Sequence, residues 1–261
     1  MIGFVSDLKS QSLYFTPFGG VQSLLCSYDR KIGKVNTFKT NYLNLADDAG
    51  FMIVYQTQNR FSFSCGISFS KIGWSYSMTI PKDLIKNPYG ISDKCLHSEA
   101  LIMHRFPILF DAVLLEKKLL KDKSDKTIKT LQFKIGGGIN VDNVPDIMDT
   151  TSKLKLNLSS IYGDTIKYTN RWNYIDHKLK TGISCAINCS FCFYNKIKNK
   201  SILELTFYYN QGLFNIINID VNYQLNSIHA HSKLYSKGTN YGVILKIPVR
   251  LYNKRIEDFN K

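Results

Sequence analysis

Three cysteines in the C-terminal half have a spacing that could support chemistry. Cys185, Cys189 and Cys192 form a C-x3-C-x2-C motif. Three thiolates so spaced can bind three irons of an iron–sulfur cluster. The same residues also lie in a stretch, 178–214, where two segments of alternating polarity flank a short charged turn, which is the pattern of a β-hairpin. The two interpretations are incompatible, because successive residues of a strand point to opposite faces.

The hairpin interpretation is favoured by what surrounds the motif. The run CAINCSFC resembles the cluster motif of the radical S-adenosylmethionine enzymes, in which the motif follows an early strand of a partial (β/α) barrel. Here only roughly the last quarter of the chain follows Cys192, and it alternates like strands. In the hairpin, Cys185 and Cys189 face one side and Cys192 the other, so the three sulfurs do not converge. We therefore predict no cofactor and mostly free thiols that behave as small apolar residues.

The five histidines are the other candidates for catalysis or metal binding. They are His97, His104, His177, His229 and His231. All but His104 lie in or beside expected long loops, and His229 and His231 could form a two-ligand metal pair on one strand face. A rim site of this kind would make the protein a lipid-modifying enzyme, which we keep as an alternative. A solvated loop histidine is the simpler interpretation of each, so we predict no catalytic residue and no metal site.

The composition favours strands over helices. The chain of 261 residues contains 16 Tyr and 16 Phe but only 6 Pro, and Ile, Ser, Thr and Asn are also abundant. No window approaches the roughly 18 continuous apolar residues of a membrane-spanning helix. The first residues also lack the features of a signal peptide. We therefore expect either a cytosolic chain or a mature or mis-started form of an exported one.

The net charge of +14 bears on possible partners. The lysines are scattered and concentrate in turns, and no stripe of arginines with stacking aromatics stands out. Solvated loops account for this pattern most simply, while an anionic lipid surface and a nucleic acid are the functional alternatives. We predict that nucleic acid is not a partner.

Alternation of apolar and polar residues recurs in eight segments. They are roughly 13–28, 49–57, 61–79, 99–115, 128–142, 177–194, 201–214 and 238–253. The apolar phase changes after Ser70, which predicts a bulge or an exit from the membrane near Gly73. The connections are alternately long and short. This predicts an all-β fold: one domain over 1–261, an eight-stranded antiparallel up-and-down transmembrane β-barrel with long outer loops, short inner turns and both termini on the short-turn side.

Six charged residues stand opposite the apolar faces of these strands and are expected to point into the barrel. They are Arg105, Asp111, Lys134, Glu204, Lys246 and Arg250. The interior of an eight-stranded barrel is just wide enough for its own side chains. We therefore predict a buried salt-bridge network rather than a conduit. A soluble β-sandwich binding module with these charges outward remains an alternative, which strand length, loop asymmetry and aromatics near strand ends disfavour.

Several segments resemble the strands of Bacteroidota outer-membrane β-barrel proteins, the group that includes the PorT-like barrels. They contain GFMIVYQTQNRFSFSCGISFSKIGWSY, HRFPILFDAVL, TLQFKIGGGINV and ILELTFYYNQGLFNI. The shared motifs are Pro107-Ile-Leu, the glycines 136–138, and Tyr209 followed by Gly212-Leu-Phe-Asn-Ile216. The resemblance implies the cell outer membrane, with both termini periplasmic. It also hints at secretion or assembly machinery. Four expected long loops without a catalytic constellation lead us to predict a non-enzymatic anchor or accessory subunit of a secretion, assembly or uptake complex, with outer-membrane lipid and other outer-membrane or periplasmic proteins as partners.

Overall fold

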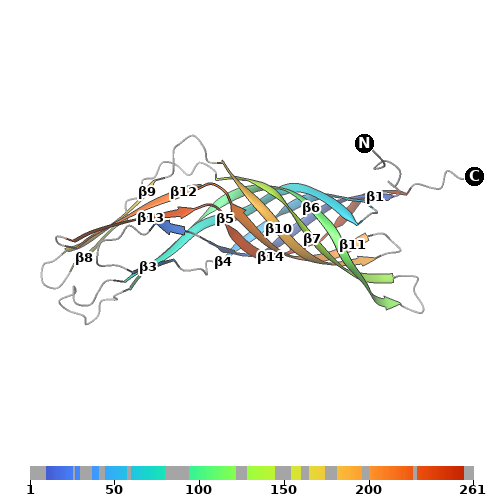
Figure 1. The fold of residues 1–261 in the computed structure, drawn as a ribbon, viewed down its shortest axis with the longest axis horizontal. Coiled ribbons are helices and arrows are strands. Elements are labelled where there is room, and N and C mark those ends of the chain that lie inside the picture. Colours follow the sequence, from blue (N-terminus) through green and yellow to red (C-terminus); the bar gives the residue numbers. More distant parts are fainter. Residues whose placement is uncertain are drawn as a thin grey trace, which may run out of the picture.

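The computed structural model describes residues 10–25, 27–29, 37–40, 45–57, 60–79, 94–121, 128–144, 154–159, 165–173, 181–195, 200–225 and 228–255. These residues form two antiparallel β-sheets, one closed and one open (Figure 1). Among them there is no helix that is long and apolar enough to span a membrane.

The larger sheet closes into a barrel. Its wall strands are β1 (Ser10–Leu24), β4 (Leu45–Thr57), β5 (Phe61–Thr79), β6 (Lys94–Lys121), β7 (Ile128–Asn143), β10 (Thr181–Asn195), β11 (Lys200–Gly212) and β14 (Asn240–Lys246). Each strand pairs antiparallel with the next, and β14 pairs back with β1 from Phe18↔Lys246 to Leu24↔Asn240. A short strand, β3 (Thr37–Thr40), adds to β5. The predicted fold class, a closed eight-stranded antiparallel barrel, is confirmed.

The eighth wall strand is interrupted at Ile247-Pro248. It resumes as β15 (Val249–Arg255), which pairs with β1 alone among the strands that the structure describes. Pairing between β11 and β14 ends at Glu204↔Lys246. Proline cannot donate a ladder hydrogen bond, whereas the amide of Ile247 donates to the carbonyl of Pro17 at 3.0 Å. The wall therefore has a seam between the start of β11 and β15.

A second, five-stranded sheet is built mostly from segments expected to be loops, although β2 overlaps the end of the predicted strand 13–28. It runs in the order β2 (Ser27–Asp29), β13 (Ile228–Ser236), β12 (Ile217–Leu225), β9 (Thr165–Asn173) and β8 (Leu154–Ser159). It lies beyond the barrel, at the end opposite to the start of β1 (Figure 1). The polar connections expected at 143–174 and 215–237 thus contain strands. These strands extend the architecture without adding to the barrel wall.

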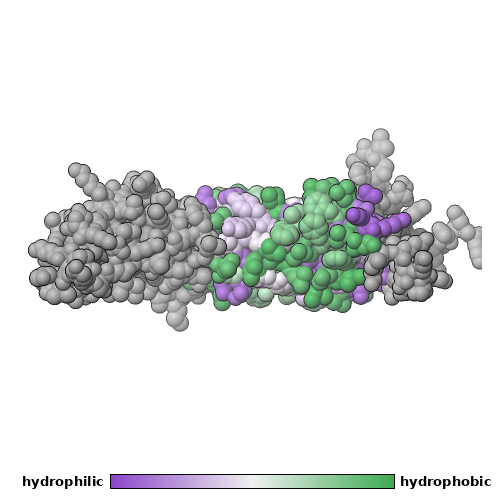
Figure 2. All heavy atoms as spheres, turned by 90° about the horizontal axis from the view of Figure 1, so that it is seen from below, coloured by the Kyte–Doolittle hydropathy of each residue, from purple (hydrophilic) through white to green (hydrophobic). Residues whose placement is uncertain are grey.

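The wall has the polarity of a membrane barrel. Along β10, exposed and buried residues alternate: Ile187 is 61% exposed, whereas Ser184 and Ser190 are almost completely buried. Apolar side chains gather over much of the barrel face that Figure 2 shows, and exposed large apolar residues occur on all eight wall strands. Lipid requires closed strand pairing and apolar outward side chains. A soluble sandwich would bury its apolar faces instead, so that alternative is not favoured.

The change of apolar phase after Ser70 has a different cause from the predicted bulge. The register of β5 against β6 is regular there, with Ser70 opposite Met103 and Ile72 opposite Leu101. Ile72 is fully buried and points inward like Ser68 and Ser70. The prediction of a bulge near Gly73 is therefore wrong: the strand continues in phase, and the lumen itself changes from polar to apolar.

The cysteines follow the hairpin geometry. Cys185 is exposed and Cys189 partly exposed, whereas Cys192 is fully buried, and all three thiols are free. Cys185 and Cys192 therefore lie on opposite sides of the wall. The three sulfurs do not converge, which excludes a cluster ligated by this motif.

Candidate functional site

The lumen contains two groups of buried charges, and the first is a lysine–glutamate–lysine triad. Lys134 Nζ lies 2.7 Å from Glu204 Oε2, and Lys246 Nζ lies 2.8 Å from Glu204 Oε1. The three residues come from β7, β11 and β14, and Glu204 and Lys246 are direct cross-strand partners. All three are less than a tenth exposed. Burying these charges is tolerable because each finds an opposite charge at hydrogen-bonding distance.

Asp111 lies beside this triad on β6. It faces Gly136 of β7, which in turn faces Asn188 of β10. A Cβ atom at position 136 would overlap the Asp111 carboxylate, so the glycine makes room for it. Asp111 also interacts electrostatically with Lys134 and Lys246. Its charge offsets the extra positive charge of the triad.

Arg105 anchors the second group of charges. Its Nε donates to Asp142 Oδ1 at 2.6 Å, and Nη1 donates to Asn240 Oδ1 at 3.1 Å. Its Nη2 donates to the carbonyl of Gly238 at 3.2 Å. Arg105 is 4% exposed and Asp142 is fully buried. The guanidinium thus joins β6 and β7 to the start of the eighth wall strand.

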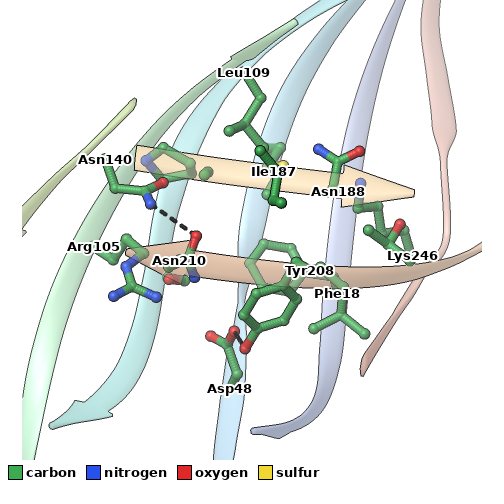
Figure 3. A pocket seen from close by; sticks show the side chains of 16 residues that line it. Phe18, Asp48, Arg105, Leu109, Asn140, Ile187, Asn188, Tyr208, Asn210 and Lys246 are labelled. Carbon is green, nitrogen blue, oxygen red and sulfur yellow. Dashed lines mark hydrogen bonds between the residues drawn. The ribbon is translucent and has the colours of Figure 1, made fainter. Parts of the chain in front are cut away.

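Amide side chains continue this group across the lumen. Asn140 Nδ2 donates to Asn210 Oδ1 at 3.0 Å (Figure 3), and Asn210 Nδ2 donates to Asn240 Oδ1 at 2.8 Å. Asn240 Nδ2 donates to Gln22 Oε1, which also accepts from Ser70 Oγ. The chain of hydrogen bonds links five wall strands and fills the lumen with ordered side chains.

Small cavities lie between the charged groups of the described barrel, and two of them are lined by residues of these groups. A cavity of about 40 Å³ is lined by Asp48, Asn188 and Tyr208 among others, and Tyr208 Oη donates to Asp48 at 2.6 Å (Figure 3). A second cavity of about 20 Å³ borders the triad. Asp48 Oδ1 and both polar side-chain atoms of Asn188 have no protein partner within the described residues. Each cavity has room for only one or a few waters.

An apolar layer lies on the loop side of Arg105. Ile72 and Met103 are fully buried, and Ile216 is 7% exposed. They surround Gly238, whose φ of 74° suits glycine, and a Cβ there would lie 3.4–3.7 Å from all three side chains. The polar network and this layer together occupy much of the lumen with the protein's own side chains.

The structure places the predicted lumen charges as follows. Five are buried, and four of these form ion pairs; the five are Arg105, Asp111, Lys134, Glu204 and Lys246. Arg250 is half-buried on β15, opposite Tyr14 in the register. Asp142 and Asp48 are also buried in the lumen and were not among the predicted charges. Asp142 shares the inward phase of Lys134, so a signal existed, whereas Asp48 precedes the expected start of its strand.

Of the histidines, the structure describes the side chain of His104. His104 packs edge-on against Phe69, with ring centroids 5.4 Å apart. His97 lies in β6, His229 and His231 lie two apart in β13, and His177 falls outside the described residues. In the part of the chain that the structure describes, no three His, Cys, Asp or Glu side chains are grouped to hold a metal ion.

Comparisons with known proteins add little to this geometry. No protein-family model matches the chain, and no curated protein matches it. Among solved structures, the chain is similar to the crystal structure of the outer membrane protein OprG from Pseudomonas aeruginosa. The TM-score is 0.38 and the identity 7%, over 91% of this chain and 96% of the other. Similarity at this level is too low to argue from, so the membrane assignment rests on wall polarity and strand closure.

Proposed function

We propose that the protein is an outer-membrane β-barrel that acts without catalysis, as an anchor or accessory subunit of an envelope complex. The observation that carries the proposal is a closed wall, apolar outside, around a lumen occupied by its own side chains. Such a wall suits lipid, and small barrels of this type belong to outer membranes. Because side chains occupy the lumen, the protein would bind its partners through the outer surface of the barrel and through the loops.

The second, five-stranded sheet (β2, β13, β12, β9 and β8; hereafter the loop sheet) supports a role in binding. Its strands come from connections far apart in the sequence, and β9 and β12 pair from Asn218↔Asn173 to Leu225↔Ile166. An ordered sheet beyond the barrel offers a defined surface to a partner. The segments that resemble PorT-like barrels support secretion or assembly machinery as the setting. Short turns at the end where β1 begins support a periplasmic position of both termini.

The test is purification from native envelopes. Affinity-tagged protein is extracted with mild detergent and analysed by native electrophoresis and chemical crosslinking. The proposal expects a species heavier than the monomer, and its loss when a short linker replaces β8 and β9. A monomer without a co-purifying protein would contradict the accessory role. Recovery in the soluble fraction without detergent would contradict the membrane assignment itself.

A further inference from the structure

β6 continues past the barrel wall at the end where β1 begins. Its pairing with β5 ends at Phe61↔Ala112, and the amide of Val113 donates to the carbonyl of Arg60 at 2.7 Å. From there to Lys121, β6 is paired with β7. The hairpin of β6 and β7 therefore projects beyond the β4–β5 turn, as Figure 1 shows at the right of the view.

The projecting strand exposes apolar and basic side chains together. Register shifts at Val113/Leu115 and Lys118/Leu120 break the inward–outward alternation. As a result, residues 114–119 are all exposed: Leu114 by 48%, Leu115 by 67% and Leu119 by 42%. Lys117 and Lys118 lie between these leucines. The leucines extend the apolar exterior of the barrel, which reaches Phe110 on the same strand.

The charge of the described side chains differs between the two ends of the barrel. At the projecting end, Arg60, Lys117 and Lys118 are exposed and Lys200 is partly exposed. Glu116 is also exposed there, and its Oε2 accepts from Gln132 Nε2 at 3.3 Å. Near the opposite end, Lys71 Nζ lies 3.2 Å from Asp47 Oδ2, which offsets its charge, and Lys237 is a partly exposed cation. Hydrophilic residues adjoin the apolar band at the projecting end, on the right of Figure 2.

We propose that the projecting segment of β6, residues 114–119, together with Arg60 binds anionic phospholipid headgroups of the adjacent leaflet. The leucines would enter the boundary between acyl chains and headgroups, where a surface that is both apolar and basic is stable. The ammonium groups of Lys117 and Lys118 and the guanidinium of Arg60 would contact lipid phosphates. This inference rests on the proposed membrane barrel and adds a lipid class and a site.

The same strand edge could instead receive a strand of a partner protein. Two features favour lipid. Lysines on a strand edge oppose pairing with another strand, and the exposed leucines continue the apolar exterior that faces lipid. The partner-strand alternative is an outcome of the test below.

The test places a fluorescent reporter within the segment. The full chain with Leu115→Trp is inserted into vesicles of phosphatidylcholine and phosphatidylglycerol, in which either lipid carries brominated, quenching acyl chains. The signal of the two native tryptophans is subtracted using the parent protein. The proposal expects quenching several-fold stronger by brominated phosphatidylglycerol at equal mole fraction. The ratio of quenching by brominated phosphatidylglycerol to quenching by brominated phosphatidylcholine measures the lipid preference. This ratio should fall to near one in the double variant Lys117→Gln, Lys118→Gln, and should decrease in high salt.

Lys71→Gln, near the opposite end of the barrel, is the matched control and should leave the preference unchanged. Equal quenching by both lipids in an inserted barrel would overturn the lipid inference and leave the proposed function standing. Equal quenching together with crosslinking of residue 115 to an envelope protein would also overturn the lipid inference and leave the proposed function standing. That result would indicate that the strand edge binds a strand of a partner protein. Failure of the folded chain to enter vesicles would overturn the proposed function instead.

Discussion

Glu204 is the carboxylate that compensates the buried charges of Lys134 and Lys246. It accepts hydrogen bonds from two buried lysines and also from Thr206 Oγ1 at 3.3 Å. Removing one member of a buried ion pair is far costlier than replacing the whole group with apolar side chains, because it leaves an uncompensated charge. The triad therefore makes a testable contribution to stability.

Glu204→Ala should lower the free energy of unfolding by about 3–5 kcal/mol, because it leaves two ammonium groups buried without their carboxylate. Urea unfolding in lipid vesicles measures this. Replacing Lys134, Glu204 and Lys246 with methionine, together with Asp111→Asn so that no unpaired charge is left beside them, should restore most of the loss. Lys71→Ala removes an exposed pair and should cost less than about 1 kcal/mol. If Glu204→Ala unfolded with the same urea midpoint as the parent protein, the triad would not stabilise the fold.

Gly136→Ala should destabilise the barrel by about 1–3 kcal/mol, because the new methyl group would overlap the Asp111 carboxylate. The matched control is Gly19→Ala on β1, where an added Cβ has open space and contacts nothing. The urea midpoints of both variants, compared in the same vesicles, check the prediction. Equal midpoints would mean that Asp111 moves aside at no cost.

At the residue scale, the sequence reveals which side chains enter the lumen but not which ones meet. Alternation alone places Lys134 and Glu204 inside. Their contact depends on how the lumen brings together side chains from β7, β11 and β14, which no local pattern contains. The Asp48–Tyr208 hydrogen bond was missed for a related reason, because it crosses the lumen between residues 160 positions apart.

At the element scale, the strands of the barrel and of the loop sheet alternate along the chain, but each strand pairs only within its own sheet. β7 pairs directly with β10 from its last residue, Asn143↔Thr181. The β8–β9 hairpin lies between these strands in the sequence, yet its pairing is within the loop sheet. The barrel wall therefore does not need this hairpin to close.

Replacing residues 150–176 with a short glycine–serine linker should leave the barrel folded. The expected result is an unchanged urea midpoint and an unchanged heat-dependent shift in gel mobility, because the wall pairs are untouched. Far-ultraviolet circular dichroism should show less β-structure, from the lost hairpin. A variant that no longer folds in vesicles would show that the loop sheet supports the wall.

Strands of the wall were predictable because their two faces meet different surroundings. β12 contains alternating Ile217, Ile219 and Val221, but its place among polar segments led to its assignment as a loop. β6 was expected to end at residue 115 and ends at Lys121. Its register shifts interrupt the alternation on which that boundary relied.

At the scale of the whole molecule, the apolar exterior defines the medium for which the wall is built. An arginine on that exterior should be costly at mid-depth and cheap near the edge, because lipid excludes charge most strongly at its centre. This dependence on depth separates a membrane barrel from a soluble one.

Ile187→Arg, in the middle of β10, should lower the free energy of unfolding in vesicles by about 2–4 kcal/mol. Leu45→Arg, at the outer end of β4, should lower it by about 0–1 kcal/mol, although Leu45 is the more exposed at 72% against 61%. Unfolding titrations of the two variants give the comparison. Equal small effects would argue against lipid around the wall.

The pairing of β1 with β14 also has a consequence for the order of folding. Elsewhere, neighbouring wall strands follow one another along the chain with no other wall strand between them. This junction instead joins residues as distant as Phe18 and Lys246, 228 positions apart. Contacts of such long range form slowly, because a large loop must close first. Circularisation therefore awaits synthesis of almost the whole described chain. Until β14 pairs with both neighbours, β1 and β11 remain open edges that invite incorrect partners, so the risk of misassembly persists until the last wall strand is in place.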